Sequence, residues 1–257
     1  MFTFTEKKLK AFFSLFQKDV TNSELSLFLE GKGNWNTHKE TQNHLDKIKK
    51  YTWVFRCVPG LQAVFFCNTT AFRAVNKSSD IDVFIITDDK LLWTTRIFIT
   101  LFTHILGVRR HGNKIASRFC LSFFATETGA FYLEDLQIQK NKDPYLAVWA
   151  ASLECFVAQK NFIENFRSHN TWIKNYELHW TQNNIKNIKT PFFITNIFSI
   201  LFKVLFIEKI LYLLFFKRTQ KKAELLKHKS GTIISEIYLK FHNEDIRGEI
   251  YEKIKEL

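Results

Sequence analysis

The stretch that decides the fold is Ser79-Asp80-Ile81-Asp82-Val83-Phe84-Ile85-Ile86-Thr87, because a polar start leads into an unbroken apolar run. A short run rich in Val, Ile and Phe is typical of a buried strand, and we predict one at 81–87. Side chains alternate across a strand, so Asp80 and Asp82 lie on one face and the residues between them on the other. The sequence therefore predicts two carboxylates side by side at the end of a strand.

The spacing of apolar residues changes along the chain on both sides of this strand. Before it, apolar residues three or four apart predict helices at 6–16, 23–29 and 37–55, and an apolar run predicts a strand at 61–67. After it, we predict a helix at 91–106, stopped by Gly107, and a strand at 118–126. Together these segments make a mixed α/β unit.

From Pro144 onward the pattern is almost entirely helical, with helices predicted at 145–160, 162–176, 191–216 and from about residue 244. We therefore predict an α+β fold, a mixed sheet with helices followed by a helical C-terminal domain. The expected parts are a helical N-terminal segment at 1–56, a mixed-sheet domain at 57–135 and the helical C-terminal domain at 136–257.

The composition is that of a globular protein, with 257 residues, 46% of them hydrophobic and 24% charged. A net charge of +12 favours anionic partners such as nucleotides, nucleic acid or a lipid surface, although AT-rich codons could equally supply the excess of Lys. The four cysteines are far apart and are expected to be reduced, buried thiols. No secretory signal opens the chain, so a cytoplasmic location is expected.

The two carboxylates could hold a divalent metal ion. Mg²⁺ takes a few carboxylates together with water and substrate phosphate oxygens, which suits an open strand end. The plainer interpretation is a solvated strand start, since two Asp one residue apart often occur by chance. The metal interpretation is favoured by residues 65–74, where a strand ends in a polar turn that opens a short helix. Backbone N–H groups and hydroxyls in such a turn can hold phosphate.

These features resemble the nucleotidyltransferase fold of the DNA polymerase β superfamily, whose pattern is a Gly-Ser turn followed by two Asp one residue apart. The resemblance is closest to a poorly characterised bacterial group of such domains. It extends over residues 58–245 and is carried by the quoted stretch together with Arg109-Arg110-His111-Gly112, Arg118-Phe119-Cys120-Leu121-Ser122-Phe123-Phe124 and Leu239-Lys240-Phe241-His242.

The resemblance implies that the 57–135 domain is nucleotidyltransferase-like. It would transfer a nucleoside monophosphate from a nucleoside triphosphate to an acceptor, which could be protein, RNA or a small molecule. Asp80 and Asp82 would hold Mg²⁺. The family's Gly and Ser correspond to Asn68 and Thr69, and Asn tolerates the left-handed conformation that such a turn requires. The implied nucleotide-binding residues are Asn68, Thr69, Ser79 and Arg118.

A third carboxylate in this family comes from a neighbouring strand. No Asp or Glu lies between Asp89 and Glu127, and the strand at 118–126 offers only Ser122 in its middle. Glu127, at the end of that strand, is the candidate for the third catalytic carboxylate, or else a plain surface acid. A second interpretation is therefore a catalytically inactive nucleotidyltransferase-fold module that binds nucleotide or a partner. Arg118 likewise ends a basic loop that could neutralise triphosphate or could simply be solvated.

The stretch from Phe192 to Phe216 is strongly apolar, but Lys203, Glu208 and Lys209 interrupt it and make membrane spanning costly. A basic cluster at 217–229 follows directly. An apolar helix followed by such a cluster could make peripheral contact with an anionic membrane surface. The alternative, which we favour, is a helix buried in the C-terminal domain or in a dimer interface.

Overall fold

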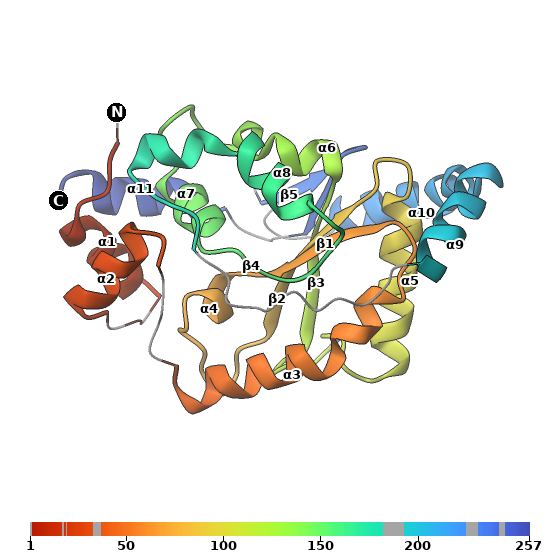
Figure 1. Ribbon diagram of the computed structural model, residues 1–257, viewed down its shortest axis with the longest axis horizontal. Helices are drawn as coiled ribbons and strands as arrows, with labels where there is room; N and C mark the ends of the chain where they lie inside the picture. The colour runs from red at the N-terminus through yellow and green to blue at the C-terminus, as the bar shows by residue number, and fades with distance from the viewer. Residues whose placement is uncertain are drawn as a thin grey trace.

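The computed structural model describes residues 2–16, 18, 20–32, 37–181, 193–224, 231–241 and 245–257. Within these residues, six strands form one mixed sheet with helices on both faces (Figure 1). The strand order is β4-β1-β2-β3-β6-β5, in which β2 and β3 are parallel and the other neighbouring pairs are antiparallel. The strands are β1 (Leu61–Phe66), β2 (Ile81–Thr87), β3 (Phe119–Thr126), β4 (Glu154–Ala158), β5 (Thr232–Ile234) and β6 (Tyr238–Phe241).

The two faces of the sheet bury separate hydrophobic clusters. On one face, α3 (Lys39–Arg56) and α5 (Leu92–Ile105) contact the sheet, and α10 (Ile207–Glu224) packs on α5. The cluster on the other face is covered by α1 (Glu6–Ser14), α2 (Asn22–Leu29), α6 (Glu127–Phe131), α7 (Pro144–Ala151), α8 (Phe162–His169) and α11 (Arg247–Lys255). The fold is therefore α+β, as predicted.

Strand β2 alternates as expected. Ile81, Val83 and Ile85 belong to the cluster under α3 and α5, whereas Phe84 and Ile86 belong to the cluster on the opposite face. Its bounds, Ile81–Thr87, are those that the sequence predicts. The preceding helices, β1, α5 and β3 also lie within a few residues of their predicted positions. Helix α5 stops at Gly107, whose φ of 65° is left-handed and suits glycine.

The prediction of an almost entirely helical C-terminal domain is wrong in part, because three strands of the sheet come from it. The expected helix at 145–160 ends at Ala151, and Glu154–Ala158 continues as β4. The apolar run of β4 is too short to distinguish a strand from part of a helix by its pattern alone. It forms a strand because its backbone can pair with the free edge of β1, which a helix could not do. Strands β5 and β6 extend the other side of the sheet, where β6 pairs with β3.

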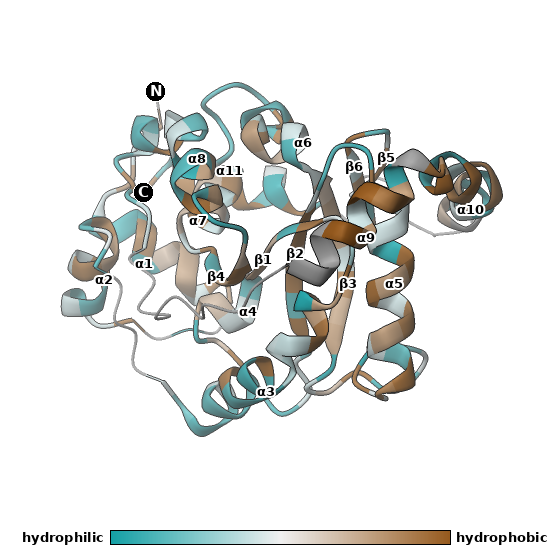
Figure 2. Cartoon of the chain, turned by 45° about the vertical axis from the view of Figure 1, so that its right-hand side comes forward, coloured by the Kyte–Doolittle hydropathy of each residue, from teal (hydrophilic) through white to brown (hydrophobic). Residues whose placement is uncertain are grey.

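The predicted helix at 191–216 is divided into α9 (Phe193–Val204) and α10, with Phe206 between them in the left-handed region at a φ of 53°. Phe192 lies outside the described residues. One side of α10 packs on the α5 cluster, but Leu205, Phe206, Leu213 and Leu214 are more than half exposed. The expectation of burial within the C-terminal domain is therefore wrong for these residues, and burial in a dimer interface stays a prediction. Figure 2 shows the apolar colouring of α9 and the mixed colouring of α10.

In the part of the chain that the structure describes, no helix has the length and apolar character needed to cross a membrane. The four cysteines are free thiols, as expected. Three of them are buried, but Cys57 is exposed, contrary to the expectation that all four are buried. It follows α3 directly, at the surface end of that helix.

Candidate metal centre

Three potential metal ligands converge where β2 and β3 begin. Asp80 precedes β2, Asp82 is its second residue, and Cys120 is the partner of Asp82 across the parallel pair. One ligand atom from each of these side chains lies within 4.8 Å of the others. The register shifts just beyond this pair, since Phe84 is opposite Phe123. Because the strands are parallel and Asp82 pairs with Cys120, their starts bring together two residues that are 38 positions apart in the chain.

The pKa of Asp82 is raised to about 6, first by burial and then by the negative charge of Asp80. Hydrogen bonds from Asn68 and Cys120 and the charge of Arg110 act in the opposite direction. Burial and the charge of Asp82 raise the pKa of the Cys120 thiol to about 12. A carboxylate pair with one strongly shifted member is typical of functional sites. A bound cation would relieve the repulsion within the pair.

Arg110 is the nearest cation to this cluster. Its Nη1 lies 2.6 Å from Asp80 Oδ2 and 3.6 Å from Cys120 Sγ. The loop that carries it is held by backbone hydrogen bonds from Arg110 N to Phe119 O and from Phe119 N to Val108 O, both 2.9 Å. The Arg110 side chain is 44% exposed, against 15% for Asp80. Arg110 therefore covers the carboxylates from the solvent side.

Asn68 occupies the turn between β1 and the short helix α4 (Asn68–Ala71). Its φ is 51°, so the predicted left-handed conformation is confirmed. The side-chain amide donates from Nδ2 to Asp82 Oδ2 at 3.0 Å, and Oδ1 accepts from the Tyr145 hydroxyl at 3.3 Å. Asn68 thus links the carboxylate to α7 and fixes the orientation of Asp82.

Two contacts hold α4 in place. Nδ1 of His44, a buried residue of α3, lies 3.1 Å from Thr70 Oγ1. At the other end of the turn, Arg73 forms an ion pair with Glu154 of β4 at 2.7 Å. The position of Asn68 therefore depends on α3 and β4 as well as on its own strand.

A cavity of about 150 Å³ opens beside the carboxylates. Asn68 and Asp82 line it together with residues from β3, α7, β6 and α11. The other lining residues that carry polar side chains include Ser122, Tyr145, Lys240, Asp245 and Arg247. The cavity therefore has an acidic part formed by β2 and cationic groups supplied by the last elements of the chain.

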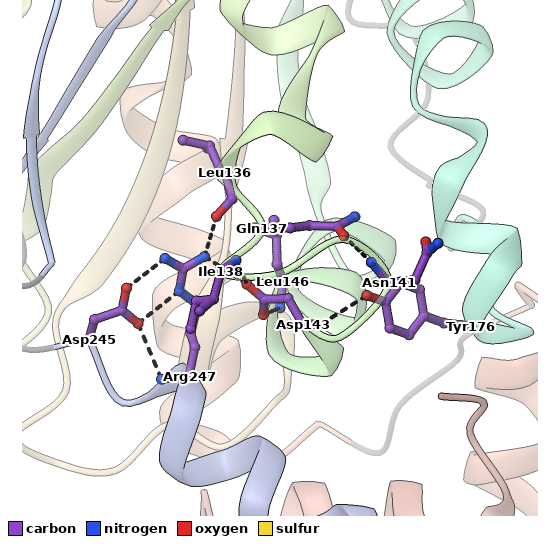
Figure 3. Close-up of polar contacts among 9 residues, drawn as sticks. All are labelled: Leu136, Gln137, Ile138, Asn141, Asp143, Leu146, Tyr176, Asp245 and Arg247. Carbon is purple, nitrogen blue, oxygen red and sulfur yellow. Dashed lines mark hydrogen bonds and ion pairs between the residues drawn. The ribbon is translucent and has the colours of Figure 1, made fainter. Parts of the chain in front are cut away.

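Arg247 is held by a network of polar contacts (Figure 3). It donates to Asp143 Oδ2 at 2.8 Å, to Leu136 O at 2.6 Å and to both carboxylate oxygens of Asp245 at 2.8 and 2.5 Å. Asp143 in turn caps the start of α7 by accepting from Leu146 N at 2.9 Å. This network joins α11 to α7 and forms one wall of the cavity.

Asn68, Asp80 and Asp82 are brought together as the sequence predicts, but the other predicted site residues are not. Thr69 and Ser79 do not line the cavity, and the Ser79 hydroxyl instead accepts from Asn76 N at 3.0 Å. Arg118 donates to Gly107 O, so its guanidinium is directed at the α5 end of the loop.

The assignment of Glu127 as the third catalytic carboxylate is wrong. It follows the last residue of β3, and Thr126 is opposite Thr87 at the far end of β2 from Asp82. Two parallel strands begin on the same side of the sheet and end on the opposite side. Glu127, at the end of β3, therefore lies near Asp88 and Asp89, which follow the end of β2.

Sequence reasoning missed Cys120, Tyr145, Lys240 and Arg247 as parts of this site. Cys120 and Lys240 lie in stretches that carry the resemblance described above, but locating them requires the β2–β3 register and the β3–β6 pairing. Comparison of the chain with protein-family models, with curated proteins and with solved structures gives no match.

Proposed function

We propose that the chain is a metal-dependent nucleotidyltransferase that moves a nucleoside monophosphate from a nucleoside triphosphate to an acceptor. The observation that carries this proposal is the convergence of Asp80 and Asp82 at the start of β2, beside a cavity that also contains Lys240. Carboxylates that hold a metal ion and a cation that neutralises phosphate are the groups that this reaction needs.

Magnesium fits the two carboxylates. Mg²⁺ is usually bound through one or two carboxylates and completes its shell with water and phosphate oxygens, so Asp80 and Asp82 are sufficient protein ligands. When bound, the ion would neutralise the charge that develops on the transferring phosphoryl group. Asn68 orients Asp82 through the 3.0 Å hydrogen bond, and this keeps one carboxylate in place before the metal arrives. Of the acceptor, we propose only that it supplies a hydroxyl or a similar nucleophile.

The third ligand position is a thiol instead of a carboxylate. Cys120 lies opposite Asp82, on the neighbouring strand from which the resembled family draws its third acid. Thiolates suit Zn²⁺ better than Mg²⁺, so Cys120 does not strengthen a magnesium site. Together with the ion pair between Arg110 and Asp80, this favours the alternative function, an inactive module that binds nucleotide.

Labelled nucleoside triphosphates with Mg²⁺ test the proposal, with pyrophosphate release and label transfer as the readouts. Asp80→Asn/Asp82→Asn is expected to abolish both, because the protein ligands of the metal are removed. The matched control is Glu134→Gln/Asp135→Asn, which removes the same charge from two exposed residues and should retain activity.

Equal activity in the wild type and the Asp80→Asn/Asp82→Asn variant would contradict the proposal. Metal-dependent nucleotide binding without pyrophosphate release or label transfer would establish the inactive module. Circular dichroism of each variant shows whether the fold is retained.

A second candidate function is contact with an anionic membrane surface through α9 and α10. It is favoured by the exposed apolar residues of these helices beside the exposed cations Lys217, Arg218 and Lys221. Co-sedimentation with anionic and with uncharged vesicles tests it. Replacing Leu213 and Leu214 with Gln should abolish binding to anionic vesicles without lowering the melting temperature, whereas unchanged binding would exclude this surface.

A further inference from the structure

Lys240 is a cation that lines the cavity. It lies on β6, its side chain is half-buried, and its pKa is lowered first by burial and then by Arg247. Among the residues that the structure describes, Nζ of Lys240 has no hydrogen-bond acceptor and no carboxylate within 4.0 Å; its nearest aromatic contact is the Phe123 ring at 6.0 Å. A half-buried charge without a partner is unfavourable, so such a group indicates an absent counter-ion.

The acidic groups nearest to Lys240 are already engaged. Asp143 and Asp245 both act on its charge from a distance, but both are bonded to Arg247. Figure 3 shows this arrangement, in which the Arg247 guanidinium is surrounded by acceptors. Among the described residues that line the cavity, Arg247 therefore has a structural role, whereas Lys240 is available to a ligand.

We infer that Lys240 binds a phosphate group of the substrate inside this cavity. The inference rests on the proposed function for the identity of that substrate, a nucleoside triphosphate. The anion would lie between the ammonium of Lys240 and a metal ion on Asp80 and Asp82, which attract it together.

The size of the cavity indicates which part of the substrate enters it. At about 150 Å³ it is smaller than the ~300–1,000 Å³ of pockets that enclose whole small-molecule ligands. Phosphate groups therefore fit inside, and the nucleoside remains outside.

Calorimetric titration with inorganic triphosphate in the presence of Mg²⁺ tests the inference on the full chain. Lys240→Gln is expected to weaken binding about ten- to hundredfold, the effect of losing one charge-assisted hydrogen bond. Lys240→Arg keeps the charge and should retain most of the affinity. The control is Lys253→Gln, an exposed residue of α11 whose replacement changes the net charge equally and should leave binding unchanged.

A second arm removes the metal. In EDTA, the Asp80→Asn/Asp82→Asn variant no longer repels phosphate, so it should bind inorganic triphosphate, and adding Lys240→Gln should abolish that binding. The melting temperature of Lys240→Gln without ligand should equal or exceed that of the wild type, because an unpaired charge has been removed.

The outcomes separate this inference from the proposed function. Triphosphate binding that is equal in Lys240→Gln and the wild type, or absent from the wild type, would overturn the inference. Binding that depends on Lys240 without nucleotidyl transfer would support the inference while the proposed reaction fails. If Lys240→Gln transferred the nucleotide with an unchanged rate and KM, the proposed reaction would be supported, and the inference about Lys240 would be wrong.

Discussion

At the residue scale, Cys120 is the difference between the candidate metal centre and a site with three carboxylates. Its thiol is directly opposite Asp82, so Cys120→Asp would place a third carboxylate beside the first two. We expect this variant to bind Mg²⁺ roughly tenfold more tightly, since each added carboxylate strengthens a site for a hard cation. Without metal it should be less stable than the wild type, because a third negative charge is confined with two others.

Magnesium titrations followed by thermal denaturation measure both effects. Cys120→Ser is the matched control, because it removes the thiol without adding charge, and its magnesium affinity should stay at the wild-type level. If the affinities for Mg²⁺ of Cys120→Asp and Cys120→Ser were equal, Cys120 would not lie at a metal ligand position.

The site residues that lie close together in the sequence are predictable from it, whereas those that come from distant segments are not. The alternation in β2 and the turn propensity of Asn68 are properties of a few adjacent residues, so Asp80, Asp82 and the left-handed turn follow from them. Glu127 was misplaced because nearness to a strand in sequence does not show at which end of the sheet a residue lies. Lys240 depends on which strand pairs with β3, and a single sequence does not contain that information.

At the element scale, the start of α5 depends on a residue of α10. The N-cap position of α5, Leu91, has no capping side chain, and Glu208 supplies the missing acceptors. Its carboxylate accepts from Trp93 N at 2.7 Å, and from Thr94 N and Thr94 Oγ1, both at 2.8 Å. Glu208→Ala should lower the free energy of unfolding by about 1–3 kcal/mol, because buried N–H donors lose a charged acceptor.

Urea denaturation measures this loss. Glu224→Ala, at the exposed end of the same helix, should change the free energy of unfolding by no more than about 0.5 kcal/mol. A Glu208→Ala variant as stable as Glu224→Ala would show that α10 does not support α5.

The contact between α3 and α4 should make the protein sensitive to mild acid. Burial lowers the pKa of His44 from its usual value of 6.5, with Asp80 opposing and Lys47 adding to the shift. The unfolded chain therefore takes up this proton at a higher pH than the folded chain. The His44 contribution to stability is complete above pH 6.5 and declines as the pH falls below it.

His44→Gln should reduce the fall in the free energy of unfolding between pH 6.5 and about 5, measured by urea denaturation at each pH. His38→Gln is the matched control, because it replaces an exposed histidine at the start of the same helix. Identical pH profiles for His44→Gln and the wild type would contradict this role.

Among the elements, the long periodic helices and the central strands were predicted, whereas β4, β5 and β6 were not. These three strands are short, and their apolar residues do not repeat often enough to distinguish a strand from part of a helix. Their conformation follows from the sheet edges on which they dock, β1 for β4 and β3 for β6.

At the scale of the whole molecule, residues 57–135 do not contain a complete sheet. Strand β1 pairs with β4 and β3 pairs with β6, and both partners lie beyond residue 135. The excised 57–135 fragment should therefore show no cooperative unfolding transition and little hydrogen-exchange protection, in contrast to the full chain. A cooperative transition in this fragment would show that the segment folds as an independent domain.

The late position of β6 also affects the protein while it is being made. Strand β3 is complete at Thr126, but the strand that covers its outer edge begins only at Tyr238. At a synthesis rate of ~5–20 residues per second, that edge stays uncovered for roughly 5–20 s on each ribosome. An uncovered strand edge in an apolar sheet pairs readily with another chain. Nascent chains on one messenger should therefore be most prone to aggregation, and most in need of a chaperone, during this interval.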